Sequence, residues 1–410
     1  MTDENGWLAS RIHAPVPFAF TLILGMFEGV DLASVGLAMS RMTSELALNA
    51  AEGGYCASAS MLGLAVGAAF GGRLADICGR RLIMFVSIIL LGAFSIASAH
   101  AWDFPSMLVT RLGAGLGMGA LMPILFALAN AAAATRFRST AIGLVMASGG
   151  VGSGLAAVVS LHPDWRTIFY FGGVGPIFMV PLMVFFLPKD VTDGERSHGD
   201  KDGTLSLYET LFGSGRLSGT LLIWILAFFI SLVSYIMINW LPTLLVQKGA
   251  TEAESHSAMI LYSIGIIVGN IVSGAILDRR SPRTPYMIGY LGTSFCIAGL
   301  ALGLGETWLY ALAGATAFFI FGAQLVTFSL TPVHYPAPVC ATGIGAMVSA
   351  GRSGSVVGPL LVGLLLHSGL SANAVLLGLV PVCVFSLVLG LVLVGVVSDA
   401  KTHAAQTNAA

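Results

Sequence analysis

Charged residues are scarce in this 410-residue chain. They make up 10% of the sequence, while hydrophobic residues make up 56%. A soluble globular domain carries about 25% charged residues. The scarcity argues against a soluble domain and predicts a chain embedded in a lipid bilayer. The sequence also lacks the short alternating segments of a transmembrane barrel, so we expect membrane-spanning helices.

Cysteine is scarce as well. The five cysteines are scattered along the chain, which predicts neither a disulfide framework nor a metal site. The sequence has no nucleophile constellation or phosphate-binding loop, which disfavours an enzyme and predicts no cofactor. It has no basic stripe with interleaved aromatic residues, so nucleic-acid binding is unsupported. Residues 1–12 lack the features of a cleaved secretory signal peptide, so we expect the first span to remain as an anchor.

Long apolar stretches divide the chain into about twelve spans of roughly 20 residues each. We expect spans at 15–38, 53–76, 82–101, 105–130, 138–160, 167–187, 218–245, 256–278, 284–304, 307–331, 341–367 and 373–397. The most polar long segment, 188–216, separates two halves. The predicted fold is an all-α integral membrane protein with a cytoplasmic N-terminus (1–14), two six-helix bundles (15–187 and 217–397), a cytoplasmic linker (188–216) and an irregular cytoplasmic tail (398–410).

The orientation follows from the distribution of Lys and Arg. If the N-terminus is cytoplasmic, the outer loops carry only Arg41, Arg166 and Lys248, and the other loop Lys and Arg residues are cytoplasmic. This asymmetry satisfies the positive-inside rule. We therefore expect a multi-pass protein of a bacterial-type inner membrane with both termini in the cytoplasm.

Four charges lie inside long apolar stretches: Glu28, Asp31, Arg111 and Arg352. A charge at the centre of a bilayer costs about 2.5–3.5 kcal/mol on insertion scales, and such residues usually mark a transport pathway. Glu28 and Asp31 are three residues apart and share a helix face. Asp31 and Arg111 are expected at similar depths, which predicts an ion pair. Arg352 and Glu28 are expected near the midplane of the bilayer.

A weak internal repeat predicts a cytoplasmic gate. The segments 72–81 and 273–283 each place Gly, then Leu-Asp, then an Arg cluster after an apolar span. Asp76 would meet the negative end of its own helix dipole, so it needs a compensating partner on another element. The residues expected in the gate are Gly72, Asp76, Gly79, Arg80, Arg81, Asp278 and Arg279.

Two segments of the sequence resemble those of a known family. The segment 72–81, GRLADICGRR, resembles the signature loop of the major facilitator superfamily, and 111–119, RLGAGLGMG, matches its fourth-helix pattern. A narrower resemblance is to the aromatic acid:proton symporter family, and within it to 3-(3-hydroxyphenyl)propionate transporters. Its carrying segments are EGVD (28–31), AWDFP (101–105), INWLP (238–242), ATGIG (341–345), GRSG (351–354) and GP (358–359). Cys340 stands where that family generally has Arg.

The resemblance implies a transporter that works by alternating access and imports an aromatic carboxylate together with protons. In this interpretation Arg352 binds the carboxylate, because a planar guanidinium suits bidentate recognition. Glu28 and Asp31 couple the proton, because two carboxylates on one helix face disfavour double ionisation. Asn239 and Gln324 either hydrogen-bond a phenolic hydroxyl or join helices. The expected partners are the substrate, protons and the lipid bilayer, and the expected functional unit is a monomer.

Three alternatives remain open from the sequence. An exporter of the same fold is disfavoured because the segment 149–154, GGVGSG, lacks the proline of the exporter motif. A membrane-bound enzyme lacks a recognisable site, and a receptor that does not transport would respond to ligand without uptake. We further expect Trp240 to lie in an interfacial aromatic belt and His334 to be solvated or to cap its helix.

Overall fold

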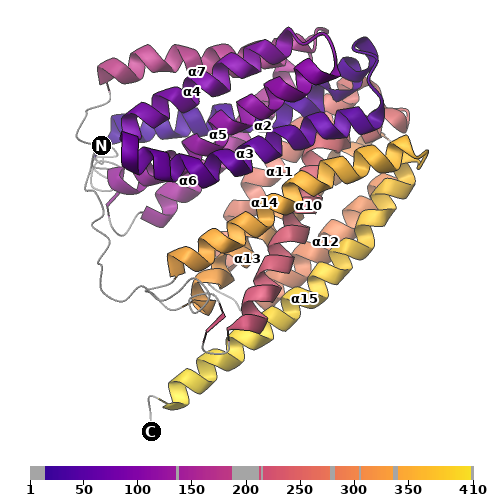
Figure 1. The fold of residues 1–410 in the computed structure, drawn as a ribbon. Coiled ribbons are helices and arrows are strands. Elements are labelled where there is room, and N and C mark those ends of the chain that lie inside the picture. Colours follow the sequence, from indigo (N-terminus) through magenta and orange to yellow (C-terminus); the bar gives the residue numbers. More distant parts are fainter. Residues whose placement is uncertain are drawn as a thin grey trace, which may run out of the picture. The chain divides into compact units, whose positions relative to one another are not determined.

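The computed structural model describes residues 14–134, 138–186, 212–213, 216–277, 282–303, 306–335 and 340–407. These residues form twelve long α-helices (Figure 1). Their bounds are α2 Pro15–Glu45, α3 Ala50–Cys78, α4 Arg80–Ala99, α5 Phe104–Ala132, α6 Arg138–Val159, α7 Arg166–Phe186, α10 Leu217–Gln247, α11 Glu252–Leu277, α12 Arg283–Leu302, α13 Glu306–His334, α14 Cys340–His367 and α15 Ala372–Thr407.

Eleven of these helices are long and apolar enough to cross a membrane. The described apolar stretch of the remaining helix, α6, is shorter and covers Gly143–Val159. Each predicted span falls on one helix. The all-helical membrane fold is therefore confirmed.

Two helix ends differ from the prediction. The first helix was expected to end at residue 38, where the apolar run stops, yet α2 continues to Glu45. Its polar last turns are held by contacts to other elements, described below. The tail was expected to be irregular, yet α15 continues to Thr407. No proline or glycine interrupts residues 396–407, so nothing in the local sequence stops the helix there.

The chain divides into two compact units. Among the described residues, unit 1 contains α2 to α7, the segment Ile238–Val246 of α10 and the start of α11 as far as Ile260. Unit 2 contains the rest of α10 and α11 together with α12 to α15. Most of the expected linker (188–216) lies outside the described residues, and the domain boundaries taken from the sequence stay a prediction.

Small residues bring helix backbones close together in unit 1. A Cβ added to Gly115 of α5 would lie 2.2 Å from the carbonyl oxygen of Ser60 on α3, and one added to Gly119 would lie 2.0 Å from that of Leu64. On α2, a Cβ at Gly29 would lie 1.9 Å from the carbonyl oxygen of Gly149 on α6. Close backbone approach of this kind is how membrane helices associate. It fixes α2, which carries Glu28 and Asp31, against α6.

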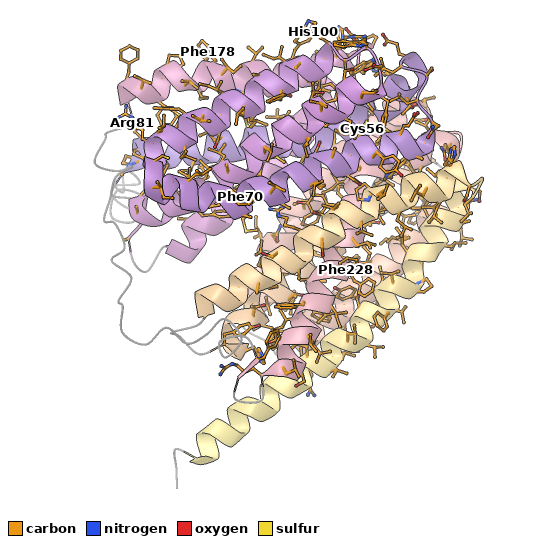
Figure 2. All side chains as sticks on the ribbon, in the orientation of Figure 1. Cys56, Phe70, Arg81, His100, Phe178 and Phe228 are labelled. Carbon is orange, nitrogen blue, oxygen red and sulfur yellow. The ribbon has the colours of Figure 1, made fainter. Side chains whose placement is uncertain are left out.

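Apolar side chains project from the helices toward the surroundings of the protein (Figure 2). Phe70 of α3 is 63% exposed and Phe178 of α7 is 64% exposed. Exposed leucine, isoleucine, valine and phenylalanine side chains occur on most of the other helices as well. A soluble monomer rarely exposes so many large apolar side chains. Lipid is the solvent that suits these faces.

Candidate functional site

The centre of unit 1 holds the ion pair between Asp31 of α2 and Arg111 of α5. Arg111 Nη1 lies 3.2 Å from Asp31 Oδ1, and neither side chain is exposed. Arg111 Nε donates to Ser98 Oγ at 3.0 Å, and Ser95 Oγ donates to Asp31 Oδ1 at 3.3 Å. The guanidinium also lies 4.8 Å from the ring centroid of Phe169, which adds a cation–π contact. The structure thus brings together the two residues that the sequence predicts as partners.

Two polar atoms of this ion pair form no hydrogen bond to any described residue. Within the described part of the chain, Asp31 Oδ2 and Arg111 Nη2 are buried and have no hydrogen-bond partner. An unsatisfied buried polar atom costs free energy, and one attached to a charged group costs more. A pair that served only to join two helices would gain from complete hydrogen bonding. The pair therefore keeps one acceptor and one donor that it does not use itself.

Glu28 lies one helical turn before Asp31 on α2. Its residue exposure is 6%, so this carboxylate is also buried. Gly25 and Gly29 flank it, and both lie against α6. The two acids therefore share one buried helix with a fixed position, as the sequence predicts from their spacing.

Arg352 lies on α14 in unit 2, where Nη1 donates to the hydroxyl of Tyr235 at 3.0 Å. The residue is partly buried. The glycines next to it bring α14 onto α10: a Cβ at Gly354 would lie 2.0 Å from the carbonyl oxygen of Phe228. The sequence prediction missed Tyr235, because a tyrosine in an apolar helix looks like an ordinary packing residue.

The two residues predicted to contact polar groups of the substrate, Asn239 and Gln324, belong to different units. Asn239 is buried in the part of α10 that belongs to unit 1, and Gln324 is partly buried on α13 in unit 2. Trp240, beside Asn239, is 1% exposed. An interfacial belt residue exposes its indole to the headgroups, so the expectation for Trp240 was wrong.

The predicted gate is described only in part. Gly72 and Asp76 lie in the last turns of α3 and Arg80 begins α4. Gly79 joins the two helices with a φ of 94°, which an L side chain rarely adopts. Arg81 donates to the carbonyl of Val184 at 3.3 Å and lies 5.6 Å from the ring centroid of Phe85. Asp278 and Arg279 lie outside the described residues, and the gate stays a prediction.

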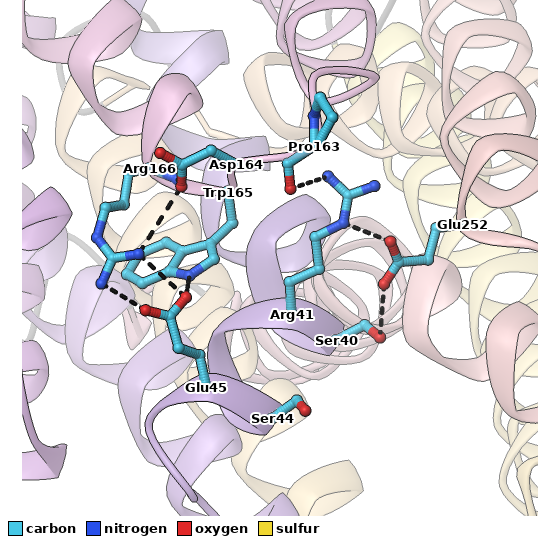
Figure 3. A pocket seen from close by; sticks show the side chains of 9 residues that line it. All are labelled: Ser40, Arg41, Ser44, Glu45, Pro163, Asp164, Trp165, Arg166 and Glu252. Atoms are coloured by element: carbon cyan, nitrogen blue, oxygen red, sulfur yellow. Dashed lines mark hydrogen bonds and ion pairs between the residues drawn. The ribbon is translucent and has the colours of Figure 1, made fainter.

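A cavity of about 630 Å³, lined mostly by polar and charged residues, opens at the end of α2 in unit 1 (Figure 3). Its two arginines, Arg41 and Arg166, each bind a glutamate. Arg41 pairs with Glu252 of α11, and Arg166 pairs with Glu45 at 2.8 Å. Trp165 Nε1 also donates to Glu45, at 2.7 Å.

The arrangement of the helices and the buried charges can be compared with known proteins. Residues 21–338 match the Major Facilitator Superfamily. The chain belongs to the major facilitator superfamily.

Individual relatives in this superfamily agree with that assignment. The chain is 37% identical to the 3-(3-hydroxy-phenyl)propionate transporter of Escherichia coli (strain K12), over 91% of this chain and 92% of the relative. It is 30% identical to the gallate transporter of Pseudomonas putida, over 90% of each. The crystal structure of a D-xylose–proton symporter superposes with a TM-score of 0.73 at 16% identity, covering 90% of this chain and 96% of that one. This last likeness shows the fold alone. Members of the superfamily are transporters and not enzymes.

The sequence analysis missed the residues that line the cavity. It counted Arg41 and Arg166 only as outer loop charges, and it gave no role to Glu45, Trp165 or Glu252. One signal was available: six residues from Ser40 to Glu45 are mostly polar and helix-compatible. Such a stretch after an apolar span favours a helix that continues beyond the membrane core with charged partners.

Proposed function

We propose that this chain is a proton-coupled importer of an aromatic carboxylic acid, and specifically of a hydroxyphenylpropionate or a related hydroxylated aromatic acid. The observation that carries the proposal is the burial of two carboxylates, Glu28 and Asp31, on one helix of a major facilitator chain, with Asp31 engaged by Arg111. The relatives named above, one a transporter of 3-(3-hydroxy-phenyl)propionate and one of gallate, support the class of substrate.

Arg352 binds the substrate carboxylate in this proposal. A guanidinium presents a rigid fork of donors to a carboxylate, which an ammonium cannot do. The bond from Nη1 to Tyr235 orients the fork and leaves its other donors for a ligand. Asn239 and Gln324 supply the polar groups that would hydrogen-bond a ring hydroxyl.

Glu28 and Asp31 couple the proton. Asp31 is held in the ion pair with Arg111, and we assign the transported proton to Glu28, which lies one helical turn away on the same helix. An anionic substrate is repelled by two ionised carboxylates, and protonation of one removes part of that repulsion. Substrate and proton therefore each favour binding of the other, which is symport in thermodynamic terms.

Transport proceeds by alternating access, with rocking of the two six-helix halves around a site near the midplane. The segment 72–81 and its counterpart 273–283 form the cytoplasmic gate. The protein lies in a bacterial-type inner membrane with both termini in the cytoplasm, as the positive-inside rule indicates, and it functions as a monomer.

Uptake of a panel of labelled aromatic acids into cells that express the protein tests this function. The panel holds 3-(3-hydroxyphenyl)propionate, gallate, 4-hydroxybenzoate and an uncharged phenol of similar size. We expect uptake of a hydroxylated acid that a protonophore abolishes, and no uptake of the phenol. Expulsion of a preloaded acid driven by the proton gradient would favour the exporter instead. A ligand-dependent response without any flux would favour a receptor.

A further inference from the structure

The first turn of α11 is tied to α2 by a charged contact at the edge of the cavity (Figure 3). Glu252 accepts from Arg41 Nε through Oε2 and from Ser40 Oγ at 3.3 Å through Oε1. Arg41 Nη1 donates to the carbonyl oxygens of His162 at 2.6 Å and Pro163 at 3.0 Å. Arg41 thus joins three elements of unit 1: α2, α11 and the connection between α6 and α7.

A buried histidine, His256, lies close to this ion pair. His256 follows Glu252 by one helical turn on α11, so the two share a helix face. His256 is 4% exposed. Its ring interacts with the charges of Arg41 and Glu252 and with the backbone of Leu37 and Ser160. Leu37 and Arg41 likewise share a face of α2, so the two helix faces meet around the imidazole.

The charges near His256 come from α2 and α11. The segment Ile238–Val246 of α10, whose Pro242 carbonyl accepts from Ser255 Oγ at 2.9 Å, contains no charged residue. Arg41 of α2 and Glu252 of α11 are the charged groups that interact with His256, and the connection after α6 contributes the backbone of Ser160. The other acid at the start of α11, Glu254, accepts from the backbone of Thr251 instead.

The other charged residues of the cavity are paired with each other: Arg166 lies 2.8 Å from Glu45 and 3.8 Å from Asp164. Arg41 and Glu252 are therefore the pair that a charge on His256 would affect.

One nitrogen of His256 has no partner. Within the described part of the chain, its Nδ1 is buried and forms no hydrogen bond. A neutral imidazole tolerates this, because one nitrogen then needs only to accept. A protonated imidazole donates from both nitrogens, so protonation here would leave a charged donor unsatisfied in a buried place beside the guanidinium of Arg41. The paired arrangement of Arg41 and Glu252 is therefore compatible with neutral His256 and strained by charged His256.

We propose that His256 is a proton-responsive group that releases the start of α11 from α2 when it is protonated. The imidazolium repels Arg41 and competes with it for the carboxylate of Glu252, so the ion pair opens. The proton arrives through the adjacent cavity, which Arg41 and Glu252 both line. With the orientation proposed above, this cavity faces the outside, so external acid would favour opening on the side from which substrate and proton enter. That directional part rests on the proposed function, whereas the release itself does not.

Hydrogen–deuterium exchange of the full-length protein in lipid nanodiscs tests the release without any substrate. The comparison is between about pH 8 and about pH 5, well below the ordinary histidine pKa near 6.5, because burial beside Arg41 disfavours the charged imidazole; each rate is corrected for the intrinsic effect of pH. In the wild type, amides of residues 252–260 should exchange roughly tenfold faster at the lower pH, as expected for loss of a buried polar contact. The start of α3, whose capping box is formed by Asn49 and Glu52, should not change.

Two variants give the test its control. His256→Gln stays neutral at both pH values, so its 252–260 amides should exchange slowly at both. Glu252→Gln breaks the ion pair directly, so its amides should exchange fast at both. The proposal is overturned if His256→Gln keeps the full pH dependence of the wild type, or if Glu252→Gln exchanges as slowly as the wild type at about pH 8. A histidine-dependent release in a protein that fails to take up any aromatic acid would leave this inference standing and reject the proposed function.

Discussion

The guanidinium of Arg111 meets the carboxylate of Asp31 at 3.2 Å between α5 and α2, and both side chains are closed off from solvent. Serine hydroxyls and the ring of Phe169 complete the surroundings. Removing one member of a buried pair leaves the other as an uncompensated charge, which costs far more than the pair contributes. The relationship predicts that Asp31 contributes to the stability of the fold, apart from the transport role proposed for it.

Asp31→Asn should therefore destabilise the protein by about 3–5 kcal/mol, the range typical of breaking a buried pair. The midpoint of thermal unfolding in detergent measures the loss. The matched control is the double variant Asp31→Asn/Arg111→Met, which removes both charges and should recover part of the stability. A single variant as stable as the wild type would show that Arg111 does not depend on Asp31.

Arg352→Lys should abolish most uptake although it keeps the charge, because a point charge does not replace a bidentate fork. Loss of a desolvated charge-assisted contact should cost roughly 2–5 kcal/mol in apparent substrate affinity. The control is Tyr235→Phe, which removes only the hydroxyl that accepts from Arg352 Nη1 and should have a smaller effect. Normal uptake by correctly inserted Arg352→Ala protein would exclude the assigned role.

The close approach of α2 and α6 at glycine residues predicts how alanine substitutions there affect stability. Gly29→Ala would place its Cβ 1.9 Å from the carbonyl oxygen of Gly149, whereas the nearest atom to a Cβ at Gly149 itself is 3.8 Å away. Overpacking costs about 1–3 kcal/mol, so Gly29→Ala should lower the thermal midpoint and Gly149→Ala should not. Equal stability of the two variants would contradict the close packing of these helices.

Protonation of His334 should make the stability of the protein depend on pH. Burial lowers the pKa of His334 below its ordinary value of 6.5, although its bond with the carbonyl of Arg216 opposes the shift. The unfolded chain then binds the proton more tightly, so this contribution to stability is complete above the ordinary value and is lost as the pH falls through the lowered pKa.

We therefore expect the thermal midpoint of the wild type to fall more steeply than that of His334→Gln between about pH 7.5 and about pH 5.5. Both proteins keep His256, so the difference between them isolates His334. Parallel pH profiles would show that burial of His334 does not affect stability, as expected for the solvated or helix-capping histidine that the sequence predicts.

The sequence predicts the helices well because hydropathy and length decide what crosses a bilayer. It also predicts the partnership of Asp31 and Arg111, since depth can be counted along a helix at a fixed rise per residue. It fails at the end of α2, because the polar turns there are stabilised by partners on other elements. Arg41 and Glu252 are 211 residues apart in the chain. No local pattern encodes such a contact, and the same holds for the bond between Tyr235 and Arg352.

The most direct test of the whole account is the behaviour of Glu28→Gln in proteoliposomes, because Gln imitates the protonated acid permanently. Two fluxes of the labelled aromatic acid are measured side by side: exchange counterflow, which needs no proton movement, and accumulation driven by an imposed pH gradient. The account predicts that the wild type performs both, whereas Glu28→Gln keeps counterflow and loses accumulation. Full gradient-driven accumulation by Glu28→Gln would contradict the account and would leave Asp31 as the acid that carries the proton.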